Sequence, residues 1–106
     1  MKHEVAMKND AGKPTLALFP KSAMFEICEV LGKGAEKYEA HNWRKGYPYS
    51  RGLSAALRHI YQYLDGEDKD SETGNSHLAH ACCMLVFMLE HEHKGYGVDD
   101  RYKEEQ

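Results

Sequence analysis

The densest group of residues able to do chemistry lies between positions 58 and 80. It begins with Arg58 and His59, continues through an acidic segment at residues 65–72, and ends with His77 and His80. Imidazole nitrogens and carboxylate oxygens are ligands for divalent cations such as Mn²⁺ and Mg²⁺. The mixture therefore indicates a divalent-metal site. Its candidate ligands are Glu67, Asp70, His77 and His80.

His77 and His80 are three residues apart, which places both imidazoles on one face of a helix, about 60° apart. Ala81 and Met84 share that face, so we expect it to point inward. Both histidines fall in the first turn of the predicted helix, where the helix dipole favours the neutral imidazole that a metal needs. The alternative is structural: a histidine on an apolar face can be a hydrogen-bonded core residue, and an acidic loop can be a solvated turn.

His59 lies on the flank of its predicted helix. The sequence leaves three roles open for it: a metal ligand, a general base, or a hydrogen-bond partner of a carboxylate. A second pair of acids, Glu36 and Glu39, also has helical i, i+3 spacing and forms a further candidate metal pair, although such pairs are common on exposed helices.

Residues 36–49 mix aromatic and cationic side chains. Aromatic faces can stack on a base, and Arg or Lys can hold phosphates, so the segment suits a nucleotide. The alternative is that Trp43 and the tyrosines cover one end of the helices. Lys13, after Gly12, is a further candidate for an anionic ligand, reached across a subunit boundary. The candidate substrate-binding residues are Lys13, Lys37, Tyr38, Asn42, Trp43, Arg44 and Arg58.

Apolar periodicity and capping residues predict three helices that position these side chains. The first runs over residues 20–31, with a continuation to 39 weakened by Gly32 and Gly34. The second begins near Ser50 and stops at 65–66, and the third follows Ser76 and runs to about 91. Residues 1–19 form an entry loop, extended near 15–19, and residues 93–106 form a charged tail that is mobile or docks on a partner.

No segment alternates as a strand would, so the fold class is all-α, a small bundle of three to four main helices in one domain over residues 1–106. Three helices from 106 residues make a thin core. We therefore expect a homodimer or homotetramer to complete the bundle.

Composition excludes several classes of function. The net charge of −3 argues against binding a nucleic-acid polymer. No apolar run is long enough for a membrane span, and the first residues do not resemble a signal peptide, so a cytoplasmic protein is expected. The three cysteines are interpreted as small apolar core residues, and His91 and His93 as solvated surface.

Three segments together resemble a known family: residues 10–14 (DAGKP), residues 34–46 with GAEKY and NWRKG, and residues 58–80 with RH, GED and HLAH. They are similar to the N-terminal domain of bacteriophage dATP/dGTP diphosphohydrolases, over about residues 8–90. The resemblance implies a helical fold related to the MazG-like nucleoside triphosphate pyrophosphohydrolases, and a phage or prophage protein acting in the host cytoplasm.

The resemblance also implies an activity: hydrolysis of a purine deoxynucleoside triphosphate to the monophosphate and pyrophosphate, with Mg²⁺ or Mn²⁺. Glu67 would then orient the attacking water, and His59 would assist as a second catalytic group. MazG-like enzymes generally carry Glu-x-x-Glu and Glu-x-x-Asp, whereas this third helix carries His77-x-x-His80. Two alternatives remain, a non-enzymatic module that binds a nucleotide or a protein, and a phosphatase acting on a monophosphate.

Overall fold

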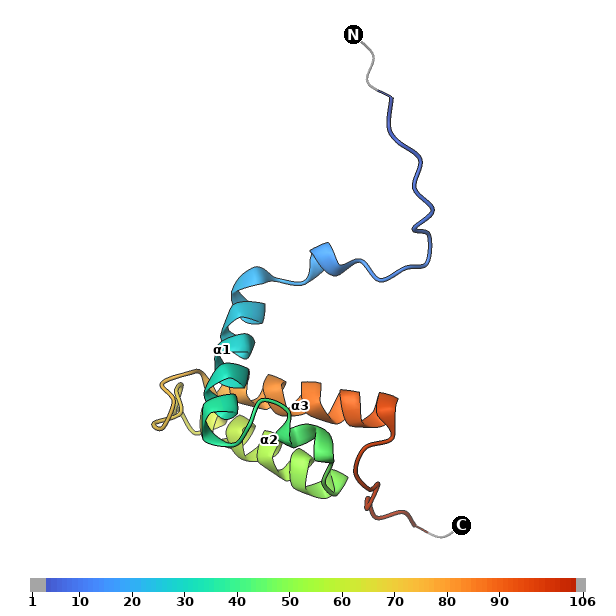
Figure 1. Cartoon of the computed structure of the whole chain (residues 1–106). Coiled ribbons are helices and arrows are strands. Elements are labelled where there is room, and N and C mark those ends of the chain that lie inside the picture. The colour runs from blue at the N-terminus through green and yellow to red at the C-terminus, as the bar shows by residue number, and fades with distance from the viewer. Residues whose placement is uncertain (1–3, 105–106) are drawn as a thin grey trace.

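A computed structural model describes residues 4–104, and it contains three α-helices within that range. These are α1 (Lys21–Lys37), α2 (Tyr49–Leu64) and α3 (His77–Lys94). Helices α2 and α3 lie side by side in opposite directions, and α1 packs across the beginning of α3 (Figure 1). The described residues contain no strands, only two isolated bridges, so the expected all-α class is confirmed.

The helix boundaries differ from the sequence expectation in three places. Helix α1 continues through Gly32 and Gly34 to Lys37, because its last turns are held by contacts with the loop at 65–76. Helix α2 is preceded by Pro48, and the Ser50 side chain bonds Asp100 instead of capping the helix. The segment predicted as extended contains a short 3-10 helix, Leu16–Leu18.

The N-cap of α3 follows the prediction, whereas the helix continues to Lys94, beyond its predicted end near residue 91. Ser76 is the N-cap, and its hydroxyl accepts a hydrogen bond from the Leu78 N–H at 3.0 Å. Gly95 ends the helix in the left-handed conformation, which a residue without a Cβ adopts at low cost. The helix is therefore fixed at both ends, and its first turn carries the two candidate histidines.

Small side chains let α2 and α3 approach closely. Gly52 and Ala56 of α2 are buried, as are Ala81 and Cys83 of α3. A Cβ at Gly52 would overlap the Met88 side chain, so this glycine sets the distance between the helices. None of the described helices combines the length and the apolar character needed to cross a membrane.

The contact between α1 and α3 is smaller. Ile27 and Val30 form a buried cluster with Ala79 and Cys83. Cys83 is the buried cysteine, whereas Cys28 and Cys82 are exposed, so interpreting all three as core residues was wrong for those two. They occupy the outer flanks of their helices, where no described segment covers them.

Residues 95–101 fold back onto the segment before α2. Val98 pairs with Pro48, and the Tyr49 N–H donates to the Val98 carbonyl at 2.9 Å. Gly46 and Gly97 meet at this point with positive φ angles of 85° and 73°. The first part of the expected tail therefore docks on its own chain.

The docked segment and η2 (Asn42–Lys45) enclose His91, which has no exposed surface. Its Nε2 bonds the Trp43 carbonyl oxygen at 2.8 Å. Interpreting His91 as solvated was wrong because the fold covers it with segments distant in sequence. His93 is exposed, as expected.

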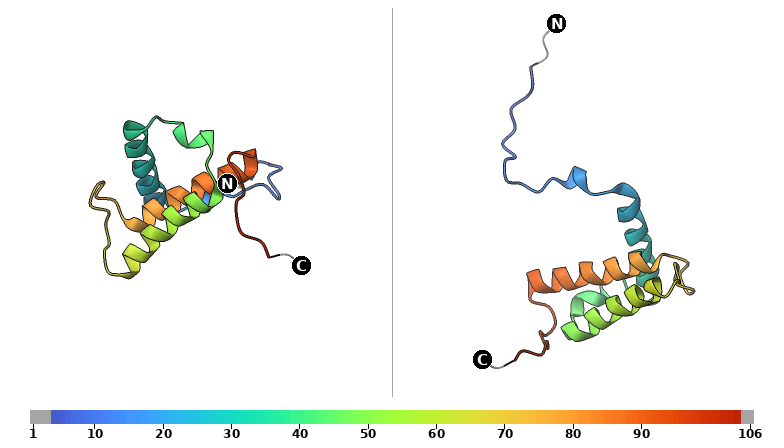
Figure 2. Two further views of the ribbon diagram at one scale, coloured as in Figure 1. Left: turned by 90° about the horizontal axis from the view of Figure 1, so that it is seen from below. Right: turned by 180° about the vertical axis from the view of Figure 1, so that it is seen from behind.

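One stripe of α3 remains uncovered. Leu78, Leu85 and Leu89 are 46%, 46% and 56% exposed, and they form a single row together with the exposed Cys82. Leu57, Tyr61 and Leu64 form a similar exposed row on α2. The entry segment reaches away from the helices in Figure 1 and in the right view of Figure 2. The radius of gyration is 18.2 Å, compared with about 13 Å for a compact domain of this length.

Replacing Gly52 with alanine should destabilise the protein by about 1–3 kcal/mol, because the added methyl group overpacks the α2–α3 contact. Gly32→Ala is the matched control: this glycine is also helical, but its Cβ would meet no atom within 4 Å. The control should gain about 0.5–1 kcal/mol from helix propensity alone. Urea denaturation measures both. Equal effects of the two substitutions would contradict the packing assigned to Gly52.

We expect the exposed rows of α2 and α3 to pair with a second copy of the chain, because apolar patches of this size are costly in water. Light scattering should therefore give at least a dimer for the wild type and a monomer for Leu85→Glu with Leu89→Glu. Leu18→Glu, in the entry segment, is a control that leaves both rows intact. A monomeric wild type at micromolar concentration would refute this expectation.

Candidate metal centre

His77 occupies the first position of α3 and has no exposed surface. Its backbone N–H donates to the Asp68 carbonyl at 3.0 Å, which ties the helix start to the preceding loop. Its Nδ1 lies 2.9 Å from Nδ1 of His59, and its Nε2 is buried without a hydrogen-bond partner. The nearest carboxylate to that nitrogen is Glu67, with Oε2 at 3.5 Å. A buried polar atom with no partner is costly, which marks this ring as a site feature.

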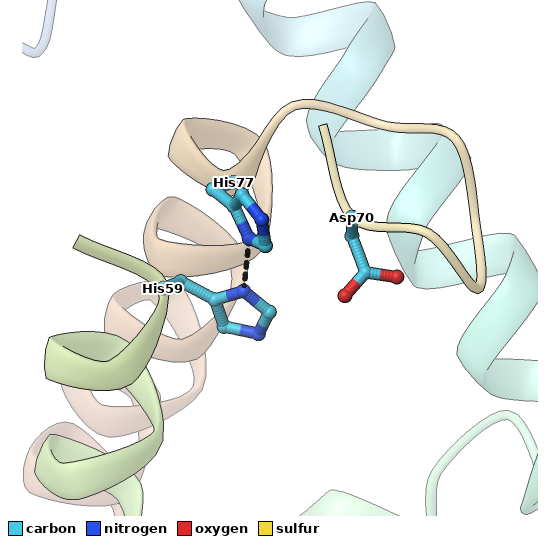
Figure 3. Close-up of side chains that lie close together, drawn as sticks. All are labelled: His59, Asp70 and His77. Carbon is cyan, nitrogen blue, oxygen red and sulfur yellow. Dashed lines mark hydrogen bonds between the residues drawn. The ribbon is translucent and has the colours of Figure 1, made fainter. Parts of the chain in front are cut away.

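His59, Asp70 and His77 come together from α2, the loop and α3 (Figure 3). Each offers one ligand atom, and these atoms all lie within 4.8 Å of one another. Asp70 accepts from the N–H groups of Glu72 and Thr73 at 2.9 and 3.0 Å, both through Oδ1. Its second oxygen is therefore available to a ligand.

His80 lies one turn along α3, with its ring stacked on His59 at 4.6 Å and 13°. Its Nε2 is 2.7 Å from the hydroxyl of Thr73. The inward face predicted from the i, i+3 spacing is confirmed, because both rings point toward α2. His80 stands outside the group of three ligand atoms found among residues 4–104.

Helix α1 holds the loop through polar contacts that sequence reasoning missed. Glu26 accepts from the Ser76 N–H at 2.7 Å, and Glu29 accepts from the Asn75 side chain at 3.0 Å. Lys33 donates to the Thr73 carbonyl and to Asn75 at 2.6 and 2.7 Å. The Glu-x-x-Glu spacing at residues 26 and 29 could have indicated these contacts, but in the sequence it resembled a pair of acids on a solvent-facing helix surface.

The surroundings of His59 and His80 lower the pKa values of both rings. Burial lowers the pKa of His59, and the neighbouring His80 and His77 lower it further. Burial is also the main reason that the pKa of His80 is lowered, against the opposing charge of Asp70. Burial would raise the pKa of Asp70, but the N–H groups of Thr73 and Glu72 outweigh it and lower that pKa. Neutral imidazoles beside an ionised carboxylate are the protonation states that bind a cation.

A cavity of about 1190 Å³ opens beside this cluster. One end is lined by His59, Asp70 and His80, and the other by η2 and the last turns of α1. The two candidate regions of the sequence therefore share one cavity. The predicted residues that line it are Glu36, Lys37, Tyr38, Glu39, Asn42, Trp43, Arg44, His59, Asp70 and His80.

The cations and aromatics of the cavity already have partners. Lys37 forms an ion pair with Glu72 at 2.9 Å, which raises the pKa of Lys37. Trp43 stacks on Phe87 at 4.5 Å, with the Arg44 guanidinium 4.3 Å from its ring. Trp43 therefore covers the end of the helices, as the structural alternative proposed. Tyr38 is 61% exposed and remains the more accessible aromatic ring.

The remaining predicted residues lie elsewhere. Glu67 is beside His77 and does not line the cavity. Glu36 and Glu39 line the cavity but do not join the group of ligand atoms in the described part of the chain. Arg58 is exposed on α2 outside the cavity lining, and Lys13 lies on the entry segment, in a turn closed by its N–H and the Asp10 carbonyl.

The fold and the site define a helical domain in which a histidine–carboxylate cluster opens onto a cavity. Residues 3–101 match the family described as dATP/dGTP diphosphohydrolase, N-terminal, so the chain belongs to that family. A protein of Salmonella phage PMBT28, described as a dATP/dGTP diphosphohydrolase, is 38% identical over 83 residues. That alignment covers 78% of this chain but 28% of the phage protein, so this chain matches less than a third of its relative. No solved structure matches.

We expect the metal-free domain to lose stability as the pH falls from 6.5. The unfolded histidines take up protons near pH 6.5, whereas the lowered pKa values of His59 and His80 keep them neutral in the folded state at that pH. Below pH 6.5 the unfolded state therefore binds more protons than the folded state. The free energy of unfolding decreases as the pH falls, and this decrease ends below the pKa values that His59 and His80 have in the folded state.

Urea denaturation with a chelator at pH 7.5 and 5.5 measures this decline. The double variant His59→Gln, His80→Gln should show a smaller difference between the two pH values than the wild type. His93→Gln, which removes an exposed histidine, is the control. An unchanged difference in the double variant would refute the assignment to these two rings.

Proposed function

We propose that this domain binds a divalent cation at His59, Asp70 and His77 and hydrolyses a purine deoxynucleoside triphosphate to the monophosphate and pyrophosphate. One observation carries the proposal: His59 and Asp70 of the cluster line the same cavity as the segment at 36–44. The description of the family and of the phage relative supplies the substrate class. The cytoplasm of the phage-infected host is the proposed place of action.

The residues fit a cation. Two imidazole nitrogens bound at about 2.1 Å would be about 3.0 Å apart at a right angle and about 3.4 Å apart at a tetrahedral angle. The observed separation between Nδ1 of His59 and Nδ1 of His77 is 2.9 Å. The two nitrogens are therefore close enough to bind one cation, and imidazole donors favour Mn²⁺ over Mg²⁺.

A cation at this position would supply the charge that neutralises the phosphate oxygens during hydrolysis. The chain's own residues prepare the site for it. Two N–H groups fix the Asp70 carboxylate, and burial lowers the pKa of His59. Lys33 and Lys37 also line the cavity, but both are bonded to the loop, so a phosphate would have to displace Glu72 to pair with Lys37.

A binding module without turnover is the second candidate, favoured by the length comparison. Because this chain matches 28% of the phage relative, the remainder of such a protein is available to supply groups needed for hydrolysis. In that case the domain would hold the nucleotide and the cation, and the chemistry would need a further segment.

Product analysis tests the proposal. The purified protein is incubated with each of the four deoxynucleoside triphosphates and Mn²⁺ or Mg²⁺, and the products are separated by chromatography. We expect monophosphate and pyrophosphate from dATP or dGTP, abolished by a chelator. His77→Ala and Asp70→Asn should each reduce the rate at least a hundredfold with helix content retained, whereas Arg58→Ala should reduce it less.

The other outcomes separate the alternatives. Release of orthophosphate would identify a phosphatase. Cation-dependent nucleotide binding without any product would support the binding module. Full activity in His77→Ala would remove the proposed metal centre.

A further inference from the structure

We propose that the two histidines of the His77-x-x-His80 pair have different roles, each fixed by a different hydrogen-bond partner. His77 binds the cation through Nδ1, with Glu67 as its positioning residue. His80 does not bind the cation; it is held by Thr73 so that its Nδ1–H donates to a phosphate oxygen of the substrate. The inference rests on the proposed function for the cation and for the identity of the anion, whereas the tautomers of the two rings can be tested without either.

The Thr73 hydroxyl determines the tautomer of His80. This hydroxyl accepts from the Asn75 N–H at 3.2 Å, and its single proton can go to one of two acceptors. Nε2 of His80 is 2.7 Å away, and Oδ1 of Asp70 is 3.4 Å away and already accepts two N–H bonds. The hydroxyl can also accept from an Nε2–H and donate its own proton to Asp70; we place the proton on the contact to Nε2 of His80, because the contact to Asp70 is the long one. In this arrangement Nε2 of His80 is an acceptor, and its Nδ1 carries the ring hydrogen.

A ring with this arrangement cannot bind a cation through Nε2, because that lone pair is used by Thr73. Its Nδ1–H has no hydrogen-bond partner among the described residues, and His80 lines the cavity. Stacking on His59 keeps the ring from rotating. A neutral N–H donor at the edge of the cavity, beside the proposed cation centre, is suited to an anionic oxygen.

The surroundings of His77 give the opposite tautomer. Its Nε2 is buried, and the Glu67 carboxylate at 3.5 Å is the acceptor nearest to it. A hydrogen on Nε2 faces that carboxylate, and the Nδ1 lone pair then faces His59 and Asp70. A carboxylate behind a ligating histidine is the usual means of fixing ring orientation. Glu67 therefore acts through His77, which explains why it does not line the cavity.

The tautomers can be read without nucleotide or metal. Long-range proton–nitrogen NMR spectra of the metal-free protein at pH 7.5 should show hydrogen on Nε2 of His77 and on Nδ1 of His80. Thr73→Val should remove the preference at His80 and leave His77 unchanged, whereas Thr73→Ser, which keeps the hydroxyl, should preserve both. The same tautomer on both rings of the wild type would overturn the proposal.

Cation affinity separates the roles. Titration calorimetry with Mn²⁺ alone should show roughly a 10- to 100-fold loss in Glu67→Ala and a larger loss in His77→Ala. Glu67→Gln keeps an acceptor oxygen and should lose far less. His80→Ala should bind Mn²⁺ within about threefold of wild type, because no ligand is removed. A loss in His80→Ala equal to that in His77→Ala would show that His80 is a ligand and overturn the proposal.

Nucleotide affinity tests the donor. With Mn²⁺ present, non-hydrolysable α,β-imido analogues of dATP and dGTP should bind His80→Ala roughly 10- to 100-fold more weakly than wild type, the usual effect of losing a bond to a charged group. His80→Asn, whose amide can donate from near the Nδ1 position, should recover part of that affinity. Unchanged analogue affinity in His80→Ala would overturn the donor role. If the wild type binds Mn²⁺ but neither analogue, the proposed function fails, and so does the donor role of His80. The assignment of His77 as a cation ligand would then still be decided by the tautomers and the Mn²⁺ affinities.

Discussion

The burial of His77 at the first position of α3 is the constraint on which the site depends. A fully buried imidazole must satisfy its nitrogens from the protein or from a ligand; here His59 of α2 is the partner of Nδ1, whereas Nε2 has no hydrogen bond and only the Glu67 carboxylate at 3.5 Å beside it. The backbone N–H of the same residue fixes the loop through the Asp68 carbonyl. One residue thereby joins the helix start, the loop and the neighbouring helix, so the geometry of the cluster follows from the geometry of the fold.

Local patterns predicted the parts of the structure that local physics controls. The apolar repeat gave the three helices, Ser76 gave the start of α3, and the spacing of His77 and His80 gave a shared inward face. Local patterns did not predict that the histidine–carboxylate cluster and the segment at 36–44 lie beside the same cavity; their joint use was implied only by the family resemblance.

The features that the sequence did not reveal all depend on contacts between distant segments. Thr73 carries no recognisable motif, and its importance appears only when the loop places its hydroxyl against His80. Glu26 and Glu29 had the spacing of an exposed pair until the loop at 73–76 was seen to pack against α1. His91 lay in a charged stretch, and residues 95–101 and η2 cover it only in three dimensions.

The attachment of α1 has a consequence for how the cavity responds to solution conditions. Its apolar contact with α3 is small, and much of its hold on the loop comes from Glu26, Glu29, Lys33 and the exposed ion pair between Lys37 and Glu72. Exposed charges are screened over about 8 Å at physiological ionic strength and over shorter distances in concentrated salt. The antiparallel pair α2–α3 rests on close apolar packing, which salt does not weaken. Concentrated salt is therefore expected to weaken the exposed Lys37–Glu72 contact first, at the last turn of α1, while the partly buried contacts of Glu26, Glu29 and Lys33 and the α2–α3 wall stay in place.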